Sequence, residues 1–394
     1  MVSKSVSLLL LIVLCKGLFA NNLTLKQVFI FSRHNIRYPL GSQLHRFTPK
    51  PWPPQGGPTG LLTPSGAQQE GYMGEYFSEW FRKEQFLVEG CPDDDTVYVY
   101  ANKVSRTKAS ARAFIDSVFK GCYVPVHHKN STKPDPLFAP VIRNTTEAYK
   151  SWVIEEITRK LQNNSKLQAS LSELNEILEI EGSDVCKRDG ICDLNGPYNT
   201  ISYKVGEEVW VNGPLFIGIS SMDAFTMSYY NGMPIQDIAW GKITTPEEWM
   251  LLTEIGRQDH YIRYTTVAED IAQPLVQYVT RIFKNYDDMP KLMLLVGHDY
   301  NMNSLATALG FESIDLLPNQ FEKYPIGGKY VFQRWTDNKK DYLKVEYVYP
   351  GFSQLRRGSR YSEENPPQVF VMRLKWCNTD EFGFCPWSEF KNKL

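Results

Sequence analysis

The stretch QVFIFSRHNIRYP, residues 27–39, passes from an apolar segment directly into a turn rich in charged side chains. Its first half, 27–32, is short and rich in Val, Ile and Phe, which is typical of a strand buried on both faces of a parallel sheet. Residues 96–101 and 292–296 have the same character. These segments predict a mainly parallel sheet at the centre of the molecule.

Helical segments alternate with these strands. Thr63 as an N-cap and Pro64 at the first helical position predict the start of a helix with one apolar stripe. Near the C-terminus, strand-like segments separated by turns favour antiparallel additions to the sheet. Further helices are predicted at 106–119 and 268–285, and further strands at 329–334, 343–349 and 369–374. The predicted fold class is α/β, with a mainly parallel sheet flanked by helices.

The pattern changes between residues 134 and 263, where helical stretches such as 147–162 and 167–181 replace the alternation. We predict that 134–263 is an inserted α-helical lobe, and that 21–133 and 264–394 form one α/β core domain. A length of 394 residues exceeds the usual size of one compact domain, which agrees with two lobes.

Residues 1–20 have the order of a secretory signal peptide: Lys4, an apolar run over 6–15, and a small residue, Ala20, at the predicted cleavage point. The run is shorter than the ~20 apolar residues that span a bilayer, so stable membrane insertion is not expected. The predicted location is secreted or extracellular, which means periplasmic in a bacterium, with a lysosome as a further destination.

Six cysteines remain after the predicted signal peptide, an even number that fits oxidised pairs in an exported protein. Six cysteines allow 15 pairings, but two couples close in sequence favour local bridges and leave the other two for each other. A zinc site at the first couple is the alternative, disfavoured by the spacing and the lack of a nearby His. The predicted bridges are Cys91–Cys122, Cys186–Cys192 and Cys377–Cys385, and the candidate glycosylation sites are Asn22, Asn130, Asn144 and Asn163.

The net charge and the composition of the chain exclude some classes of binding partner and of protein. Lys and Arg number 43 against 44 Asp and Glu, a net charge of -1, so no global field favours nucleic acid or an anionic membrane. Any anion site must therefore be local. Hydrophobic residues at 42% exclude a mainly disordered chain.

Each of the three buried strands runs into a polar turn, at 32–39, 102–107 and 297–301. Ligands of open α/β sheets bind beyond the carboxyl ends of the strands, so these turns are predicted to share one pocket. Arg33, Arg37 and Arg106 can present planar forks of donors to a phosphoryl group. The alternative for each Arg alone is a helix cap or a surface ion pair.

The two histidines of these turns are assigned different roles. His34 is the candidate nucleophile, because a neutral imidazole can attack phosphorus and its cationic neighbours disfavour protonation. His298 would donate a hydrogen bond to a phosphoryl oxygen, and Asp299 would protonate the leaving alkoxide. A bound dianion is expected to raise the pKa of Asp299, which favours activity at acid pH. The alternative for an isolated His after a strand is a structural role.

The string Arg-His-x-x-Arg-x-Pro at 33–39, followed by Gly-His-Asp at 297–299, resembles the histidine acid phosphatases of the phosphoglycerate-mutase-like superfamily. Most members carry Gly after the motif His, whereas Asn35 is similar to the glucose-1-phosphatase group, which is close to the bacterial periplasmic phytases. The likeness spans about 25–386 and includes segments at 48–52, 71–74, 98–102, 223–225, 239–241 and 325–329.

This resemblance implies the same site as the residues themselves indicate: His34 as nucleophile, Asp299 as proton donor, and a phosphate-binding set of Arg33, Arg37, Arg106 and His298. It also implies an α/β sandwich with an α lobe over the site, Leu40 on the substrate side of the cleft, and chemistry without a metal or other cofactor. Two adjacent histidines, His127 and His128, cannot easily chelate one metal. No partner is assigned to His45 or His260.

The predicted function is a secreted acid phosphatase that forms a phosphohistidine. Its substrates are small phosphate monoesters, sugar phosphates such as glucose 1-phosphate first and phytate second, and no nucleic-acid partner is expected. One alternative is a secreted effector or binding protein that keeps the phosphate pocket without turnover. Another is a phosphomutase that passes the phosphoryl group to a second hydroxyl.

Overall fold

The structure is a computed structural model that describes residues 23–41, 43–93, 95–316 and 320–393. The predicted signal peptide at 1–20 and the sequon at Asn22 lie outside the described residues. Over the described ranges, no helix combines the length and the apolar character needed to cross a membrane.

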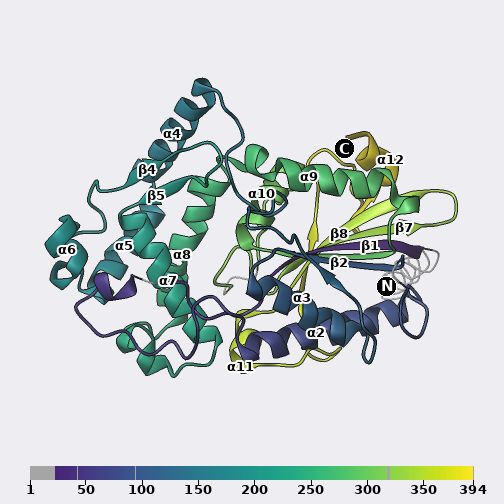
Figure 1. The fold of residues 1–394 in the computed structure, drawn as a ribbon, viewed down its shortest axis with the longest axis horizontal. Coiled ribbons are helices and arrows are strands. Elements are labelled where there is room, and N and C mark those ends of the chain that lie inside the picture. Colours follow the sequence, from purple (N-terminus) through teal and green to yellow (C-terminus); the bar gives the residue numbers. More distant parts are fainter. Residues whose placement is uncertain (1–22, 42, 94, 317–319, 394) are drawn as a thin grey trace, which may run out of the picture.

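One mixed sheet forms the centre of the larger part of the molecule (Figure 1). Its order is β10-β8-β7-β1-β6-β2-β3, with β9 paired to β8. The pairs among β1, β6, β2 and β3 are parallel, whereas β7 to β10 add in antiparallel fashion. The bounds are β1 Thr24–Arg33, β2 Val97–Ala101, β3 Val126–His127, β6 Leu292–Gly297, β7 Lys329–Thr336, β8 Asp341–Tyr349, β9 Gln368–Met372 and β10 Phe384–Pro386. The predicted α/β class and its antiparallel additions are confirmed.

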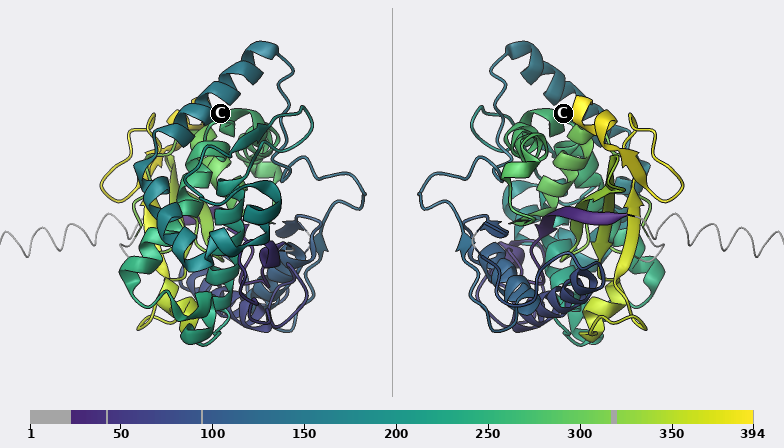
Figure 2. Two further views of the ribbon diagram at one scale, coloured as in Figure 1. Left: turned by 90° about the vertical axis from the view of Figure 1, so that its left-hand side faces the viewer. Right: turned by 90° about the vertical axis from the view of Figure 1, so that its right-hand side faces the viewer.

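Strand β1 is buried on both faces, which explains its nearly continuous apolar sequence. Phe29 and Phe31 belong to one hydrophobic cluster, while Val28 and Ile30 belong to another on the opposite face. The right-hand view of Figure 2 shows β1 between the two helix layers. Helices α9 (Ala268–Lys284) and α10 (Asp299–Leu309) cover one face, and α2 (Pro64–Lys83) and α3 (Ser105–Val118) cover the other.

Helix α2 begins where the sequence predicts it. The Thr63 side chain accepts a hydrogen bond from the Gly66 N–H at 2.9 Å, and Pro64 occupies the first turn, where its missing N–H leaves no bond unmade. The backbone N–H of Thr63 also donates to the Ile36 carbonyl at 2.9 Å. The start of α2 is therefore attached to the charged turn that follows β1.

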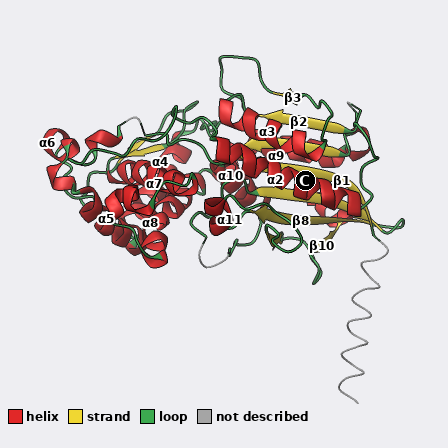
Figure 3. Ribbon diagram, turned by 90° about the horizontal axis from the view of Figure 1, so that it is seen from below, coloured by secondary structure: helices red, strands yellow, loops and turns green. Residues whose placement is uncertain are grey.

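A helix-rich part lies beside the sheet, at the left of Figures 1 and 3. It also holds a two-stranded antiparallel sheet that was not predicted, because strands of three residues are too short to show a period. Its elements are α4 Glu147–Gln162, α5 Ser165–Leu178, α6 Asp184–Asp189, β4 Thr200–Ser202, β5 Trp210–Asn212, α7 Pro214–Tyr230 and α8 Pro246–Asp259. The division of the chain into domains at 134 and 263 stays a prediction.

Two short helices complete the C-terminal region, α11 (Phe352–Arg357) and α12 (Trp387–Lys393). All three predicted disulfides are present, Cys91–Cys122, Cys186–Cys192 and Cys377–Cys385. Among the sequons, Asn130 and Asn163 are exposed and Asn144 is half-buried; their glycosylation stays a prediction.

Candidate active site

The carboxyl ends of three parallel strands lie side by side. Arg33 of β1 is in register with Gly297 of β6, and Ala101 of β2 with Val296. The three polar turns therefore leave the sheet at one edge, as predicted. They line a cavity of about 410 Å³, together with residues of α7 and α8. The cavity brings together every residue predicted for the site: Arg33, His34, Arg37, Leu40, Arg106, His298 and Asp299.

His34 is buried and held in one orientation. Its Nδ1 lies 2.8 Å from the Asn35 carbonyl oxygen, and its backbone N–H donates to the Gly297 carbonyl at 3.1 Å. Because a carbonyl only accepts, Nδ1 carries a proton, so Nε2 is the nitrogen with the lone pair when the imidazole is neutral. Burial, followed by the positive charge of Arg106 and other neighbours, lowers the pKa of His34 well below 6.5. The charged neighbours act on this pKa in the predicted direction, and burial is the larger cause.

His298 lies beside His34, with 5.5 Å between the ring centroids. The Asn102 amide is 2.8 Å from its Nε2, and an Arg106 guanidinium nitrogen is 3.4 Å from its Nδ1. Burial and the charge of Arg106 lower the pKa of His298 well below its ordinary value. Asn102, the residue directly after β2, thus fixes the second histidine and was not singled out from the sequence.

Asp299 is the first residue of α10, where the helix dipole favours a carboxylate. Its Oδ2 forms an ion pair with Arg33 at 2.8 Å, and its Oδ1 accepts the Tyr300 N–H at 2.9 Å. Although burial would raise the pKa of Asp299, Arg33 and two histidines, His260 and His298, lower it far below its ordinary value. Asp299 is therefore a carboxylate in this arrangement, and the raised pKa expected with a bound dianion stays a prediction.

The Arg37 side chain is held in place by a carboxylate of the helix-rich part. Its two terminal nitrogens donate to both carboxylate oxygens of Asp223 on α7, at 3.0 and 2.6 Å, a bidentate pair. The same carboxylate accepts the backbone N–H of Leu40 at 3.1 Å. Leu40 itself is 47% exposed at the cavity. Asp223 was missed as a site residue, because 186 residues separate it from Arg37.

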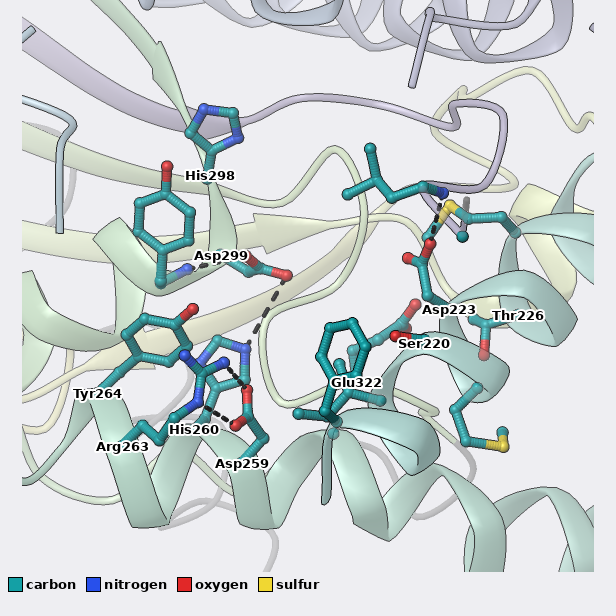
Figure 4. A pocket seen from close by; sticks show the side chains of 18 of the residues that line it. Ser220, Asp223, Thr226, Asp259, His260, Arg263, Tyr264, His298, Asp299 and Glu322 are labelled. Carbon is teal, nitrogen blue, oxygen red and sulfur yellow. Dashed lines mark hydrogen bonds and ion pairs between the residues drawn. The ribbon is translucent and has the colours of Figure 1, made fainter. Parts of the chain in front are cut away.

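His260 is a further site residue that the sequence did not reveal. Its Nε2 lies 3.9 Å from Asp299 Oδ2 (Figure 4), and it begins a π-helical turn, His260–Tyr264. Within the same turn, the Arg263 side chain makes two hydrogen bonds to Asp259 and one, at 2.9 Å, to Glu208. No sequence pattern predicts a π-helical turn, and His260 and Arg263 are far along the chain from the motif at 33–39.

Comparison with known proteins agrees with this geometry. Residues 24–179 match the family described as "Histidine phosphatase superfamily (branch 2)". The chain is 40% identical to glucose-1-phosphatase of Salmonella typhimurium over 380 residues, which cover 94% of this chain and 92% of that protein. The chain belongs to branch 2 of the histidine phosphatase superfamily. This histidine phosphatase is a phosphoric monoester hydrolase.

Other relatives of this histidine phosphatase carry similar names. Glucose-1-phosphatase of Providencia rettgeri is 38% identical over 384 residues, which cover 95% of this chain and 92% of that protein. Phytase AppA of Escherichia coli K12 is 27% identical over 396 residues, with 93% and 90% covered. The solved phytase of Hafnia alvei in complex with tartrate superposes with a TM-score of 0.84 at 27% identity, with 94% and 96% covered.

The cavity of this histidine phosphatase holds nearly balanced charge. Arg33 and Arg37 are each paired with a carboxylate, whereas no ion pair involves Arg106 in the part of the chain that the structure describes. Burial and the charge of Arg37 lower the pKa of Arg106 to about 10. The charged lining residues are Arg33, Arg37, Arg106, Arg257, Arg263 and Lys323, against Glu208, Asp223, Asp259, Asp299 and Glu322.

The remaining histidines lie outside the cavity of this phosphatase. His127, on β3, stacks on Tyr98 with 5.0 Å between ring centroids, and His128 and His45 are exposed. Over the described ranges, no three His, Cys, Asp or Glu side chains are grouped to hold a metal ion.

Proposed function

We propose that this histidine phosphatase hydrolyses small sugar phosphates through a phosphohistidine at His34. The observation that carries the proposal is the placement of His34, with one free ring nitrogen, in a cavity with Asp299 and with Arg33, Arg37 and Arg106. Arginine forks suit phosphoryl oxygens, and a neutral imidazole suits attack on phosphorus.

The reaction has two steps in this proposal. His34 Nε2 forms a bond to phosphorus while the ester P–O bond breaks, and the leaving oxygen takes a proton from Asp299. Water then attacks the phosphohistidine, Asp299 accepts the proton of that water, and inorganic phosphate leaves with His34 restored. Arg33, Arg37, Arg106 and His298 bind the phosphoryl oxygens and stabilise the charge that develops on them.

The charge of the cavity favours an ester with one phosphoryl group. One dianion is matched by Arg106 and by donors of Arg33 and Arg37, but further phosphates meet carboxylates such as Glu208, Asp259 and Glu322. The relatives at 40% and 38% identity are glucose-1-phosphatases, whereas the phytase relative is 27% identical. A side-by-side assay should therefore give a higher kcat/KM for glucose 1-phosphate than for phytate, and the reverse order overturns this substrate assignment.

The direct test of the nucleophile is His34→Ala, assayed with an aryl phosphate near pH 5 in excess chelator. We expect phosphate release to fall by at least about 10³-fold with the circular dichroism spectrum unchanged, since the variant lacks the imidazole that forms the phosphoenzyme in this proposal. The matched control is His127→Ala, a histidine outside the cavity, which should keep full activity. Retention of activity by His34→Ala, or strict dependence on an added divalent metal, contradicts the mechanism.

Export of the enzyme is a second part of the proposal. The three disulfides fit an oxidising compartment, as does the signal-like order of residues 1–20. N-terminal sequencing of the protein recovered from the medium or periplasm should begin near Asn21. Recovery only in the cytosol with residues 1–20 attached contradicts export.

A further inference from the structure

Asn35 follows the nucleophile assigned to this site, and each of its polar groups is engaged. Its carbonyl oxygen lies 2.8 Å from His34 Nδ1, and its backbone N–H donates to Ser110 Oγ at 3.0 Å. Its side-chain Oδ1 accepts the Ile36 N–H at 2.8 Å, and its Nδ2 donates to Glu70 Oε2 at 2.7 Å. The peptide group that fixes the His34 tautomer is thus held from both sides.

Glu70, which receives the Asn35 amide, belongs to a buried ion pair. The side chains of Glu70, on α2, and Lys329, at the start of β7, are 1% and 0% exposed. Lys329 Nζ bonds to Glu70 Oε1, to Ser32 Oγ at 2.9 Å and to the Gly327 carbonyl at 3.1 Å. A buried carboxylate is tolerated because this cation and the Asn35 amide satisfy its oxygens. The pair therefore offers Asn35 a rigid, charged acceptor.

Gly327 leaves the space that the Asn35 side chain occupies. A Cβ at 327 would lie 2.6 Å from Asn35 Nδ2, closer than any real contact, and its φ of +69° also favours glycine. The Gly327 N–H donates to the His34 carbonyl at 3.1 Å, and the Arg33 N–H donates to the Gly328 carbonyl at 2.9 Å. The turn at 33–35 is therefore closed against 327–328, with the amide of Asn35 filling the gap.

We propose that the Asn35 side chain, anchored on the Glu70–Lys329 pair, is a positioning group that keeps the His34 proton on Nδ1 and the Nε2 lone pair toward the phosphoryl group. Asn35 does not touch the substrate in this proposal; it acts through the orientation of its own peptide carbonyl. The inference rests on the proposed role of His34 as nucleophile and adds the device that sets its tautomer.

The first test is Asn35→Ala, which removes the amide and keeps a β-carbon. With the Asn35 carbonyl free to tilt, kcat for an aryl phosphate should fall roughly 10- to 100-fold, the size of effect that a small misplacement of a reacting group produces. KM should stay unchanged, because the arginines that bind phosphate keep their partners. Histidine-selective ¹⁵N NMR should show the His34 ring only with Nδ1 protonated in the wild type, and with a second tautomer in Asn35→Ala.

The second test is Asn35→Asp, which places a carboxyl where the amide donates to Glu70. Two carboxyls at hydrogen-bond distance raise the pKa of one of them, and Lys329 is the charged group that opposes this rise. Below the raised pKa the introduced carboxyl is protonated and can donate to Glu70 again. The ratio of kcat in Asn35→Asp to kcat in the wild type should therefore increase as pH falls from 7 to 4.5, which a merely structural role does not predict.

Gln69→Ala is the matched control, because Gln69 is the neighbouring buried residue of α2 and bonds to Tyr361 and the Ser359 carbonyl instead. It should lose stability without a change in kcat or in the His34 tautomer. A wild-type kcat and tautomer in Asn35→Ala overturn this inference alone, provided that His34→Ala is inactive. Full activity in His34→Ala overturns the proposed function itself.

Discussion

Arg33 forms an ion pair with Asp299, and this contact decides when Asp299 can act as an acid. The guanidinium is the largest of the influences that lower the pKa of Asp299, and burial opposes it. A phosphoryl dianion competes for the same Arg33 donors and adds negative charge beside the carboxyl. We therefore expect substrate binding to raise the pKa of Asp299, so that the acid forms only when an ester is present.

This role predicts that Asp299→Asn slows turnover according to the leaving group. For glucose 1-phosphate, whose alkoxide leaves poorly without a proton, kcat/KM should fall about 10²- to 10⁴-fold. For 4-nitrophenyl phosphate, whose phenolate leaves readily, the fall in kcat/KM should be much smaller. The measurement is kcat/KM of both substrates for wild type and Asp299→Asn at one pH, because kcat also contains the hydrolysis of the phosphohistidine that both substrates share. An equal loss of kcat/KM for both substrates would exclude Asp299 as the proton donor.

At the scale of elements, two glycines let α2 approach its neighbours. A Cβ at Gly66 would lie 2.2 Å from the Ile36 carbonyl oxygen, beside the turn that carries His34. A Cβ at Gly74 would lie 2.4 Å from the Phe114 carbonyl oxygen of α3. Both distances are to backbone, which cannot move aside cheaply. The placement of α2 against α3, and of its first turn against the motif, depends on these missing side chains.

Gly74→Ala should therefore destabilise the protein although alanine is the better helix former. Forcing α2 and α3 apart is expected to lower the free energy of unfolding by about 1–3 kcal/mol, measured by urea denaturation. The control is Gly256→Ala in α8, where nothing lies within 4 Å of the added Cβ. That variant should gain up to about 1 kcal/mol from helix propensity. Stabilisation by both substitutions would contradict the close contact between α2 and α3.

At the scale of the whole molecule, three buried histidines couple stability to pH. Burial is the largest cause of the lowered pKa in His34, His260 and His298. In the unfolded chain each titrates near 6.5, so the unfolded state binds more protons below that pH. The free energy of unfolding should therefore decrease as pH falls below about 6.5, until the folded histidines themselves take up protons.

His298→Asn tests this coupling, because it removes one of the three groups and keeps a polar side chain. Between pH 6 and 5, the slope of unfolding free energy against pH should become smaller by about 1 kcal/mol per pH unit, close to one proton. The measurement is urea denaturation at several pH values. An unaltered slope in His298→Asn would show that this histidine is protonated in the folded state.

The order of apolar segments and polar turns along the sequence was enough to predict the sheet and a site at the carboxyl ends of its parallel strands. Strands 27–32, 96–101 and 292–296 were predicted because burial on both faces requires apolar side chains at every position. Parallel strands end at one edge, so the convergence of His34, Arg106 and Asp299 followed from their places after those strands. The start of α2 followed from the chemistry of Thr63 and Pro64, which is local.

Only the tertiary structure decided what each of these groups contacts. Arg37 is held by Asp223, and the Asn35 amide donates to Glu70. Asp299 also lies near His260, which belongs to a π-helical turn. These partners are separated by tens to hundreds of residues, and polar side chains on helices carry no periodic signal of the cavity they face. The direction of a pKa shift depends on such contacts and on burial, so it could be assigned only from the tertiary structure.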